Sequence, residues 1–477
     1  MSDFGWPSGS DSCRFDIVII GTGPAGVAVA ERLYERHSFA TIAMVEQGSL
    51  LLRQHFYDSH GSMRDRDRFL ELHRHCPWEG DLSRGGALLP CLGGRGIVGG
   101  SQLHRFYDSD FSLWANGLWG VRTAELSPYF DEAEERLLGG VRSASSSQDY
   151  AHSALAGFNA RHPPYGPAAV AANGLNDGFP HRSSVQRILA LLDRDRQATS
   201  RRLALFTNTV AVKLATRQPR REEITHVQCV RAGGSSGKSM TIHGAAFVLA
   251  ASPVESARLV LVSGIGEADS SSSVVGRYLA EHIYCRGLLD VSGNPELNRG
   301  PINLFIPPPG DDLDDRFQVE LRSTIHPDDS RALLRLTGSA AMDPRRENRL
   351  TLSPGRVDIY GVPRAMTVLT RSPDDERRTL AMLNAMDRVA AFLGGRWLTP
   401  PEILPCGASY HESGTLRIAG PEQESAAAAD GLLFGTTNVF VGDGAAFASI
   451  GVANPILTLT AMGYRLGDRL AELISSA

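Results

Sequence analysis

Two polar side chains near the end of the chain and a glycine turn near its start are of the types that alcohol oxidation requires. His411 lies in the segment SYHESGT, Asn454 lies in GVANPILT, and Gly21 begins the turn GTGPAG. Removal of hydride from a carbinol carbon needs a base for the hydroxyl proton, a second polar group that fixes the hydroxyl, and an acceptor facing the carbon. The imidazole and the carboxamide are candidates for the first two roles. The glycine turn is a candidate site for a nucleotide that carries the acceptor.

The glycine turn lies within a complete β-α-β pattern between residues 15 and 47. The apolar strand FDIVII precedes it, the amphipathic helix GVAVAERLYER follows, and the strand TIAMVEQ contains Glu46, twenty residues after Gly26. In such a unit the glycines permit a tight turn, backbone approach to a pyrophosphate and close helix packing, while the helix N-terminus stabilises the phosphate charge. Glu46 is placed to bind ribose hydroxyls. The pattern predicts a dinucleotide site, but by itself it does not separate FAD from NAD.

Composition sets limits on the class of protein. A length of 477 residues, 42% hydrophobic and 21% charged, is ordinary for a soluble protein of two domains. The net charge of -5 lacks the basic excess of proteins that bind nucleic acid or anionic membranes, and it favours a small neutral or cationic substrate. No apolar run is as long as a membrane span, and the N-terminal segment lacks signal-peptide features. We therefore expect a cytoplasmic protein with reduced, scattered cysteines that binds neither nucleic acid nor membrane.

Segments beyond the glycine turn resemble the glucose-methanol-choline (GMC) oxidoreductase family. The loop LGGRGIVGGSQLH is similar to that family's R-x-x-x-G-G-S loop beside the flavin, with Arg95, Gly99, Gly100 and Ser101 at the motif positions. Trp114 and the later PYF-x-x-AE run fit the stretch that follows. Further matches, in the family's order, are VLAASPVESARLVLVSGIG, VGRYLAEH, YHESGT, VGDGAAF and NPILT. The resemblance implies FAD as the cofactor, and the lack of a second nucleotide loop disfavours an NAD dehydrogenase.

The resemblance also implies roles for individual side chains. The family's catalytic pair corresponds to His411, in H-x-x-G-T, and Asn454, in N-P-x-L-T. Neutral His411 would accept the hydroxyl proton as hydride passes to flavin N5, and Asn454 would hold the substrate oxygen. Asp443 matches an aspartate beside the ribityl and pyrophosphate groups, and Val210 matches a residue on the adenine side.

His104 stands four residues after Gly100, where some family members attach a histidine covalently to the flavin 8α carbon. Two interpretations remain open, a covalent link and a loop histidine that forms local hydrogen bonds. We expect no metal site, because metal-ligand spacing is lacking among the clustered histidines His55, His60, His73 and His75. The residues expected at the cofactor are Gly21, Gly23, Pro24, Ala25, Gly26, Glu46, Arg95, Gly99, Gly100, His104, Val210, Ala251, Asp443, Asn454 and Pro455.

These motifs predict an α/β plus α+β protein whose Rossmann-like FAD-binding domain is discontinuous. We assign 14–140, 195–290 and 405–477 to that domain. The Pro-, Gly- and Ser-rich segment 141–194 is expected to be a connector or lid, and 291–404 to be a substrate-binding domain built on an antiparallel sheet.

Local patterns predict the elements of both domains. The helix SVQRILALLDRDR precedes strands LALFTNT, VAVKLA, THVQCVRA, SMTIH and AAFVLAAS, which resemble a β-meander and a returning parallel strand. FQVELRSTI and NRLTLSPG are typical of the antiparallel sheet, and a helix is expected near 374–394. LSPYFDEAEERLLG predicts a helix that begins at Ser-Pro, and NPILTLTAMGYRLGDRLAELI predicts a long final helix.

Within the family, the motifs of this chain most resemble those of the bacterial pyranose-oxidase-like and aminoglycoside-sugar-oxidising members. The resemblance thus implies oxidation of a sugar, amino-sugar or polyol hydroxyl to an aldehyde or ketone, in natural-product (antibiotic) biosynthesis. Three alternatives stay open: an oxidase that reduces oxygen, a dehydrogenase with another acceptor, and a non-redox, hydroxynitrile-lyase-like use of FAD. Oxidation of a non-sugar alcohol is also compatible with the motifs, and the sequence does not indicate an oligomeric state.

Overall fold

The first β-α-β unit of the chain forms the inner part of the sheet in its nucleotide-binding half. The computed structural model describes residues 12–51, 75–97, 103–112, 119–138, 183–216, 222–233, 239–265, 273–298, 302–326, 329–420 and 424–476. Strand β1 (Ser12–Ile20), helix α1 (Pro24–Arg36) and strand β2 (Ile42–Val45) confirm the unit predicted between residues 15 and 47. The last four residues of β1 are all buried without alternation, because the strand lies inside a sheet that is covered on both faces.

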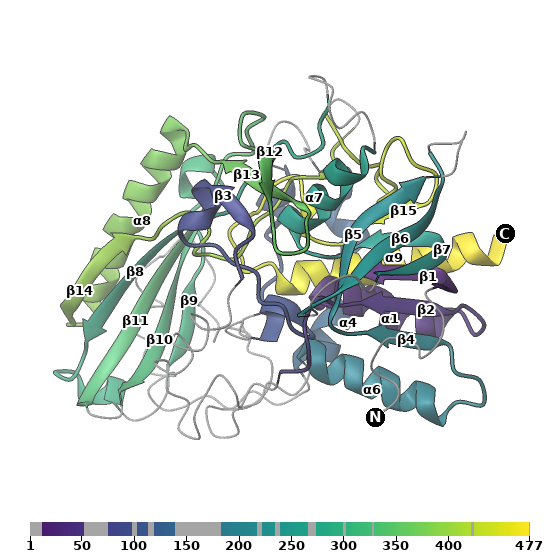
Figure 1. Ribbon diagram of the computed structural model, residues 1–477. Coiled ribbons are helices and arrows are strands. Elements are labelled where there is room, and N and C mark those ends of the chain that lie inside the picture. The colour runs from purple at the N-terminus through teal and green to yellow at the C-terminus, as the bar shows by residue number, and fades with distance from the viewer. Residues whose placement is uncertain are drawn as a thin grey trace.

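A seven-stranded sheet of described strands continues from this unit (Figure 1). Its other strands are β4 (Leu203–Phe206), β5 (Thr209–Thr216), β6 (Ile224–Arg231), β7 (Ser239–Leu249) and β15 (Val439–Val441). The order is β4-β2-β1-β7-β6-β5, and β15 pairs with β7. The β-meander and the returning parallel strand are confirmed, but the prediction of two strands between 239 and 249 was wrong. They form one strand, because β1 pairs with β7 along its whole length.

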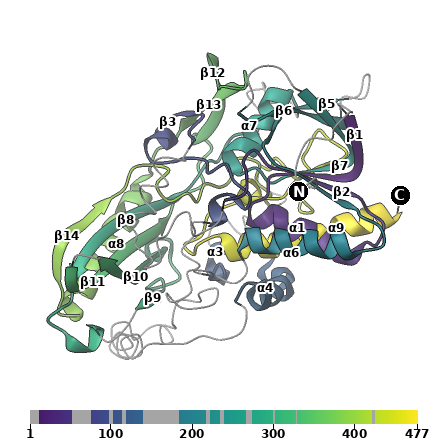
Figure 2. The same ribbon diagram turned by 60° about the horizontal axis from the view of Figure 1, so that its bottom comes forward.

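Helices cover one face of this sheet, and Figure 2 shows α1, α6 and α9 side by side below the strands. Besides α1, the described helices of this half are α3 (Asp108–Ser112), α4 (Thr123–Leu138), α6 (Ser184–Gln197), α7 (Pro253–Ser263) and α9 (Ile456–Ser476). Gly463 lets α9 approach α1, since a Cβ there would be 2.7 Å from Ala28 Cβ. The long final helix is confirmed. The start predicted for α4 at Ser-Pro was wrong, because Arg122 O already accepts from Leu126 N ahead of Pro128.

The second half is built on a five-stranded antiparallel sheet of described strands, which confirms the expected substrate-side architecture (Figure 1). In sheet order the strands are β14 (Arg396–Ile403), β8 (His282–Asp290), β11 (Asp329–Ala341), β10 (Phe317–His326) and β9 (Asn303–Ile306). Helix α8 (Pro373–Phe392) agrees with the helix expected near 374–394 and packs on one face of the sheet. Strand β8 pairs with β11 and β14, although the expected domain boundary at residue 290 placed it in the FAD-binding domain.

A small third sheet links the two halves. It contains β12 (Arg349–Val357), β13 (Pro363–Val368) and β3 (Trp78–Gly80). The segment NRLTLSPG thus forms β12 in this sheet and not part of the five-stranded one, because its hydrogen-bond partner is β13. Arg258 of α7 joins the sheet to the nucleotide half by donating to Pro363 O at 2.7 Å and Asp358 Oδ2 at 2.6 Å. No helix in the described ranges is long and apolar enough to cross a membrane.

Candidate active site

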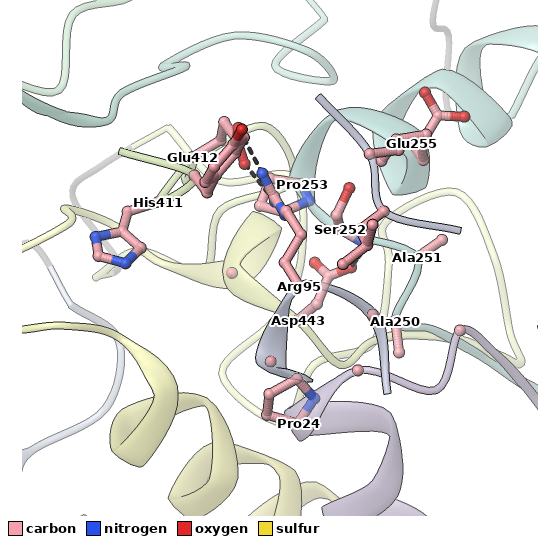
Figure 3. Close-up of a pocket in the computed structure, with 18 of the residues that line it drawn as sticks. Pro24, Arg95, Ala250, Ala251, Ser252, Pro253, Glu255, His411, Glu412 and Asp443 are labelled. Atoms are coloured by element: carbon pink, nitrogen blue, oxygen red, sulfur yellow. Dashed lines mark hydrogen bonds and ion pairs between the residues drawn. The ribbon is translucent and has the colours of Figure 1, made fainter. Parts of the chain in front are cut away.

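One cavity of about 470 Å³ is lined by residues of both large sheets. It contacts the β1–α1 turn at one end and His411 and Asn454 farther along, and Figure 3 shows part of its lining. The predicted site residues that line it are Gly21, Gly23, Pro24, Ala25, Glu46, Arg95, Val210, Ala251, His411, Asp443, Asn454 and Pro455. Gly26 and His104 are not among its lining residues, and Gly99 and Gly100 lie outside the described residues.

The β1–α1 turn has the shape that a dinucleotide requires. Gly21 has φ +107°, and a Cβ there would lie 2.1 Å from Ala250 O, so the turn itself demands glycine. At Gly26 a Cβ would lie 2.4 Å from Gly21 O, which explains the close helix packing. Gly23 differs, because its φ is -64° and no described atom lies within 4 Å of an added Cβ. Folding gives no reason for glycine at 23, whereas a pyrophosphate at the N-terminus of α1 does. The turn therefore fits FAD.

Glu46 is held at the end of β2 beside this turn. Thr22 Oγ1 donates to Glu46 Oε2 at 2.5 Å, and Gly48 N donates to Oε1 at 2.9 Å. Burial raises the pKa of Glu46 to about 7, and these two hydrogen bonds act in the opposite direction. Glu46 lines the cavity, where its carboxylate is of the type that accepts hydrogen bonds from ribose hydroxyls. Val210 of β5 lines the same end.

Asp443 lies beside the turn between β7 and α7 (Figure 3). It accepts hydrogen bonds from Ser252 N at 3.0 Å, Ser256 Oγ at 2.6 Å and Ala445 N at 2.8 Å. Burial raises the pKa of Asp443 to about 6, against the effect of these donors. Ser252 has φ 86°, a strained value for a residue with a side chain. Asp443 thus holds the backbone of a strained turn against the cavity.

Arg95 and Glu412 join the loop at 95 to the loop that carries His411 (Figure 3). Arg95 Nη1 donates to Glu412 Oε1 at 2.8 Å, and its second amino group contacts the other carboxylate oxygen. The Glu412 side chain is fully buried, so this two-pronged ion pair is shielded from water. The Arg95 guanidinium also lies 5.7 Å from the centre of the Tyr410 ring. Arg95 therefore contacts both sequence neighbours of His411, Tyr410 and Glu412, and so fixes the backbone that carries the imidazole.

His411 makes a short contact with a second histidine, the last residue of the VGRYLAEH segment, to which the sequence interpretation gave no role. His282, the first residue of β8, lies with Nδ1 2.8 Å from His411 Nδ1 and Nε2 3.1 Å from Gly451 O. His282 is buried, and burial lowers its pKa to about 4, so the ring is neutral. The pKa of His411 is also held well below its usual value, first by burial and then because a second proton would be repelled electrostatically by His282 and Arg95.

Tyr284 connects His411 to Asn454. Its hydroxyl oxygen lies 3.3 Å from His411 Nδ1, and the hydroxyl donates to Asn454 Oδ1 at 3.3 Å. Asn454 and Pro455 immediately precede helix α9. Because Oδ1 of the carboxamide accepts from Tyr284, its amide nitrogen is the side that donates. The structure thus brings the two predicted catalytic residues together through a tyrosine of the substrate sheet.

His104 lies against the five-stranded sheet. Its ring centre is 3.7 Å from that of Phe305 on β9, and the side chain is buried. Ser101 and Trp114, which carried part of the family resemblance, lie outside the described residues, as do His55, His60 and His73. His75 is described and lines the cavity.

The side chains that the sequence interpretation missed come mainly from the substrate sheet. They lie on strands β8, β10 and β11, which run along the cavity, and they are His282, Tyr284, Arg286, Glu320, Arg322, Arg335 and Thr337. The alternation of polar and apolar residues in HIYCRGLLD and FQVELRST was a usable signal, because it marks a sheet with one face that is not packed in a core.

Comparison with protein families identifies the class. GMC oxidoreductase models match residues 83–284 and 344–463. The chain belongs to the GMC oxidoreductase family. It is an FAD-dependent oxidoreductase that acts on CH–OH donors, with a fold that positions a histidine and an asparagine beside the cofactor cavity.

Individual relatives cover nearly the whole chain. Paromamine 6'-oxidase of Streptomyces fradiae is 25% identical over 99% of this chain and 94% of its own length. C-glycoside 3-oxidase of Microbacterium trichothecenolyticum is 24% identical over 97% of this chain and 98% of its own. Among solved structures, formate oxidase of Aspergillus oryzae has a TM-score of 0.68 at 14% identity and covers 98% of this chain and 100% of its own. The last likeness shows the fold.

Proposed function

We propose that the protein oxidises a sugar or polyol hydroxyl to a carbonyl, with His411 as the base and Asn454 as the group that holds the substrate oxygen. Bound FAD supplies the acceptor for the hydride that leaves the carbinol carbon. The proposal is supported by the convergence of His411, Asn454, Glu46 and Asp443 on one cavity. The residues of this chain then have three tasks: to bind the alcohol, to orient it and to take its proton.

The contact between His411 and His282 carries the proposal, since it decides which nitrogen acts. A carbonyl oxygen only accepts, so neutral His282 holds its proton on Nε2 toward Gly451 O. Its Nδ1 is then an acceptor, and the neighbouring His411 Nδ1 must be the donor across 2.8 Å. His411 Nε2 is left with its lone pair, in the form a general base needs. The low pKa of His411 keeps that nitrogen deprotonated in neutral solution.

Asn454 completes the arrangement from the nucleotide half. With Oδ1 accepting from Tyr284, the amide N–H group can donate to the substrate oxygen. A donor at that oxygen stabilises the negative charge that develops as the proton leaves. His411 and Asn454 would thus contact the same hydroxyl from different elements of the fold.

Sugar hydroxyls are the substrate class that the relatives favour. Paromamine 6'-oxidase and C-glycoside 3-oxidase are named for oxidation of carbohydrate positions, and both align along almost the entire chain. Both are also named oxidases, which favours oxygen as the electron acceptor. We further propose that the FAD is held without a covalent bond to His104, because that ring packs on Phe305 and does not line the cavity.

A substrate screen tests this function. The FAD-loaded protein is mixed without oxygen with a panel of sugars and polyols, and flavin absorbance at its visible band is followed. We expect at least one member to bleach the flavin, with peroxide formed when air is admitted. Bleaching that needs an artificial acceptor for turnover would indicate a dehydrogenase. A panel that never bleaches the flavin would contradict alcohol oxidation. Flavin that remains with acid-precipitated protein would contradict the non-covalent assignment.

A further inference from the structure

The five-stranded sheet has two chemically different faces. On β10 the residues Phe317, Val319 and Leu321 are buried, and Val319 lies opposite Gly338 of β11. A Cβ on Gly338 would meet the sulfur of Met382 at 2.7 Å, so this face packs against helix α8. The residues between them therefore point to the other face, because side chains alternate along a strand.

The other face carries charge, and it lines the cavity. Glu320, Thr337 and Arg286 lie opposite one another across β10, β11 and β8, and all three line the cavity that contains His411 and Asn454. Tyr284 stands two residues before Arg286 on the same face and contacts His411 and Asn454. The charged group thus begins next to the residues proposed to act on the hydroxyl.

Arg322 and Arg335 form the next row of this face. They lie directly opposite each other on β10 and β11, and both line the cavity. Like charges directly opposite on neighbouring strands destabilise a sheet. An anion between the two guanidinium groups would offset this repulsion.

Ion pairs within the described part of the chain do not account for Arg286 and Arg322. The cavity's other carboxylates are engaged elsewhere. Glu412 pairs with Arg95, and Glu255 and Asp358 pair with Arg258. Glu46 and Asp443 accept the hydrogen bonds described above at the nucleotide end. Within the described part of the chain, Arg286 and Arg322 form no ion pair, and Arg286 Nε is buried without a hydrogen-bond partner.

Among the described residues, two carboxylates remain near the arginines. Glu402 lies opposite Arg286 on β14, but it is exposed and does not line the cavity. Among the described residues that line the cavity, Glu320 therefore stands as the carboxylate beside the guanidinium groups of Arg286 and Arg322. Burial raises the pKa of Tyr284, and the negative charge of Glu320 raises it further. The positive charges of Arg286 and Arg335 lower it, so the charged residues of this face act electrostatically on the tyrosine hydroxyl.

Resting on the proposed alcohol oxidation, we propose that the substrate carries an anionic group, a carboxylate or a phosphate, on a sugar or polyol. Arg286, Arg322 and Arg335 bind the anion, Glu320 accepts from a hydroxyl, and the carbinol to be oxidised lies at His411 and Asn454. Aldonates, uronates and sugar phosphates have this chemistry. An ammonium-bearing amino sugar is disfavoured, because it would place a cation among the arginines.

A binding comparison on the FAD-loaded protein tests the charge preference independently of turnover. Isothermal titration is run at fixed ionic strength with glucuronate, glucose 6-phosphate, glucose and glucosamine. We expect one of the anionic sugars to bind about tenfold or more tightly than glucose, and glucosamine to bind most weakly. Glucose or glucosamine binding as tightly as both anions, or no binding by either anion at millimolar concentration, would overturn the proposal.

One substitution that removes a positive charge and one that removes a negative charge test whether this face of the sheet causes the preference for anions. Arg322→Gln should weaken binding of the preferred anion by about tenfold and leave glucose unchanged, while Glu320→Gln should tighten it. Arg396→Gln is the matched control, because Arg396 is 76% exposed on β14 of the same sheet and does not line the cavity. If Arg322→Gln changes anion binding no more than Arg396→Gln does, the assignment is wrong.

The two proposals fail in different ways. If the anion binds with the expected dependence on Arg322 and Glu320 but the flavin is never reduced, alcohol oxidation fails and the anion site stands. If glucose or glucosamine reduces the flavin at least as efficiently as both anions, alcohol oxidation stands and the anion site fails.

Discussion

Backbone conformation shapes one end of the cavity, and side chains shape the other. At the nucleotide end, backbone conformation sets the shape: Gly21 makes the turn, Gly23 leaves space, and Thr22 and Gly48 hold Glu46 in place. At the substrate end, side chains from neighbouring strands set the shape, and Arg322 lies opposite Arg335 across β10 and β11. A cofactor shared by a whole family can be held by backbone, whereas substrate preference depends on side chains that change easily.

The largest expected effect lies at the substrate end. His411→Ala should slow flavin reduction by about a hundredfold or more, because it removes the proposed base. Anaerobic stopped-flow absorbance with the best substrate of the screen measures the rate. Flavin content should stay unchanged, since His411 is not part of the glycine turn. Equal rates in variant and parent would remove His411 from the mechanism.

A pair of glycine substitutions tests the nucleotide end. Gly21→Ala should cost about 3 kcal/mol or more of the free energy of unfolding, because a Cβ would lie 2.1 Å from Ala250 O at a φ of +107°. Gly23→Ala should leave the stability of the FAD-free protein nearly unchanged and weaken FAD binding, because its methyl enters space that no described atom fills. Denaturant unfolding and flavin fluorescence titration measure the two quantities. Equal FAD affinity of Gly23→Ala and parent would contradict the placement of the pyrophosphate.

A smaller effect is expected at His282, which acts through His411. His282→Leu removes the acceptor for His411 Nδ1–H and should lower the flavin reduction rate by about tenfold. His282→Asn offers its carboxamide oxygen near the same place and should recover part of the loss. The measurement is kcat against KM for both variants, together with the pH profile of flavin reduction. If the two variants lose the same amount, the tautomer assignment is wrong.

The smallest effect is a displacement of the pH profile. An ordinary imidazole is half protonated at about pH 6.5, and His411 has a pKa well below that value. Flavin reduction should therefore stay at its plateau at pH 6.5 and decline only in more acidic solution. A decline centred at pH 6.5 or above would contradict the enclosed base. Rates are measured directly after a pH jump, since neutral buried His282 makes the fold less stable as pH falls from 6.5 toward 4.

Much of the nucleotide half could be predicted from sequence because its determinants are local. A glycine turn between an apolar strand and a helix specifies its own geometry, and Glu46 follows at a fixed distance along the chain. The pairing of His411 with Asn454 came from family motifs. The contacts of these two residues with His282 and Tyr284 could not be foreseen, because they depend on β8 joining the substrate sheet.

The substrate end shows the limit more clearly. Single strands reveal which residues share a face, but not which strand lies beside them. The juxtaposition of Arg322 with Arg335, or of Glu320 with Arg286 across Thr337, follows from the register of three strands. The expectation of a neutral or cationic substrate came from net charge alone. Net charge averages over surface residues that never contact the substrate.

The place of His282 on β8 has a consequence for attempts to redesign the enzyme. The strand that supports the imidazole of His411 also bears Arg286 on the wall facing the ligand. A chimera that received this sheet from another member would replace, in a single exchange, both the recognition surface and the neighbour that sets the tautomer of the base. Altering which alcohol is accepted by domain swapping should therefore disturb the speed of the reaction as well, unless residue 282 is retained.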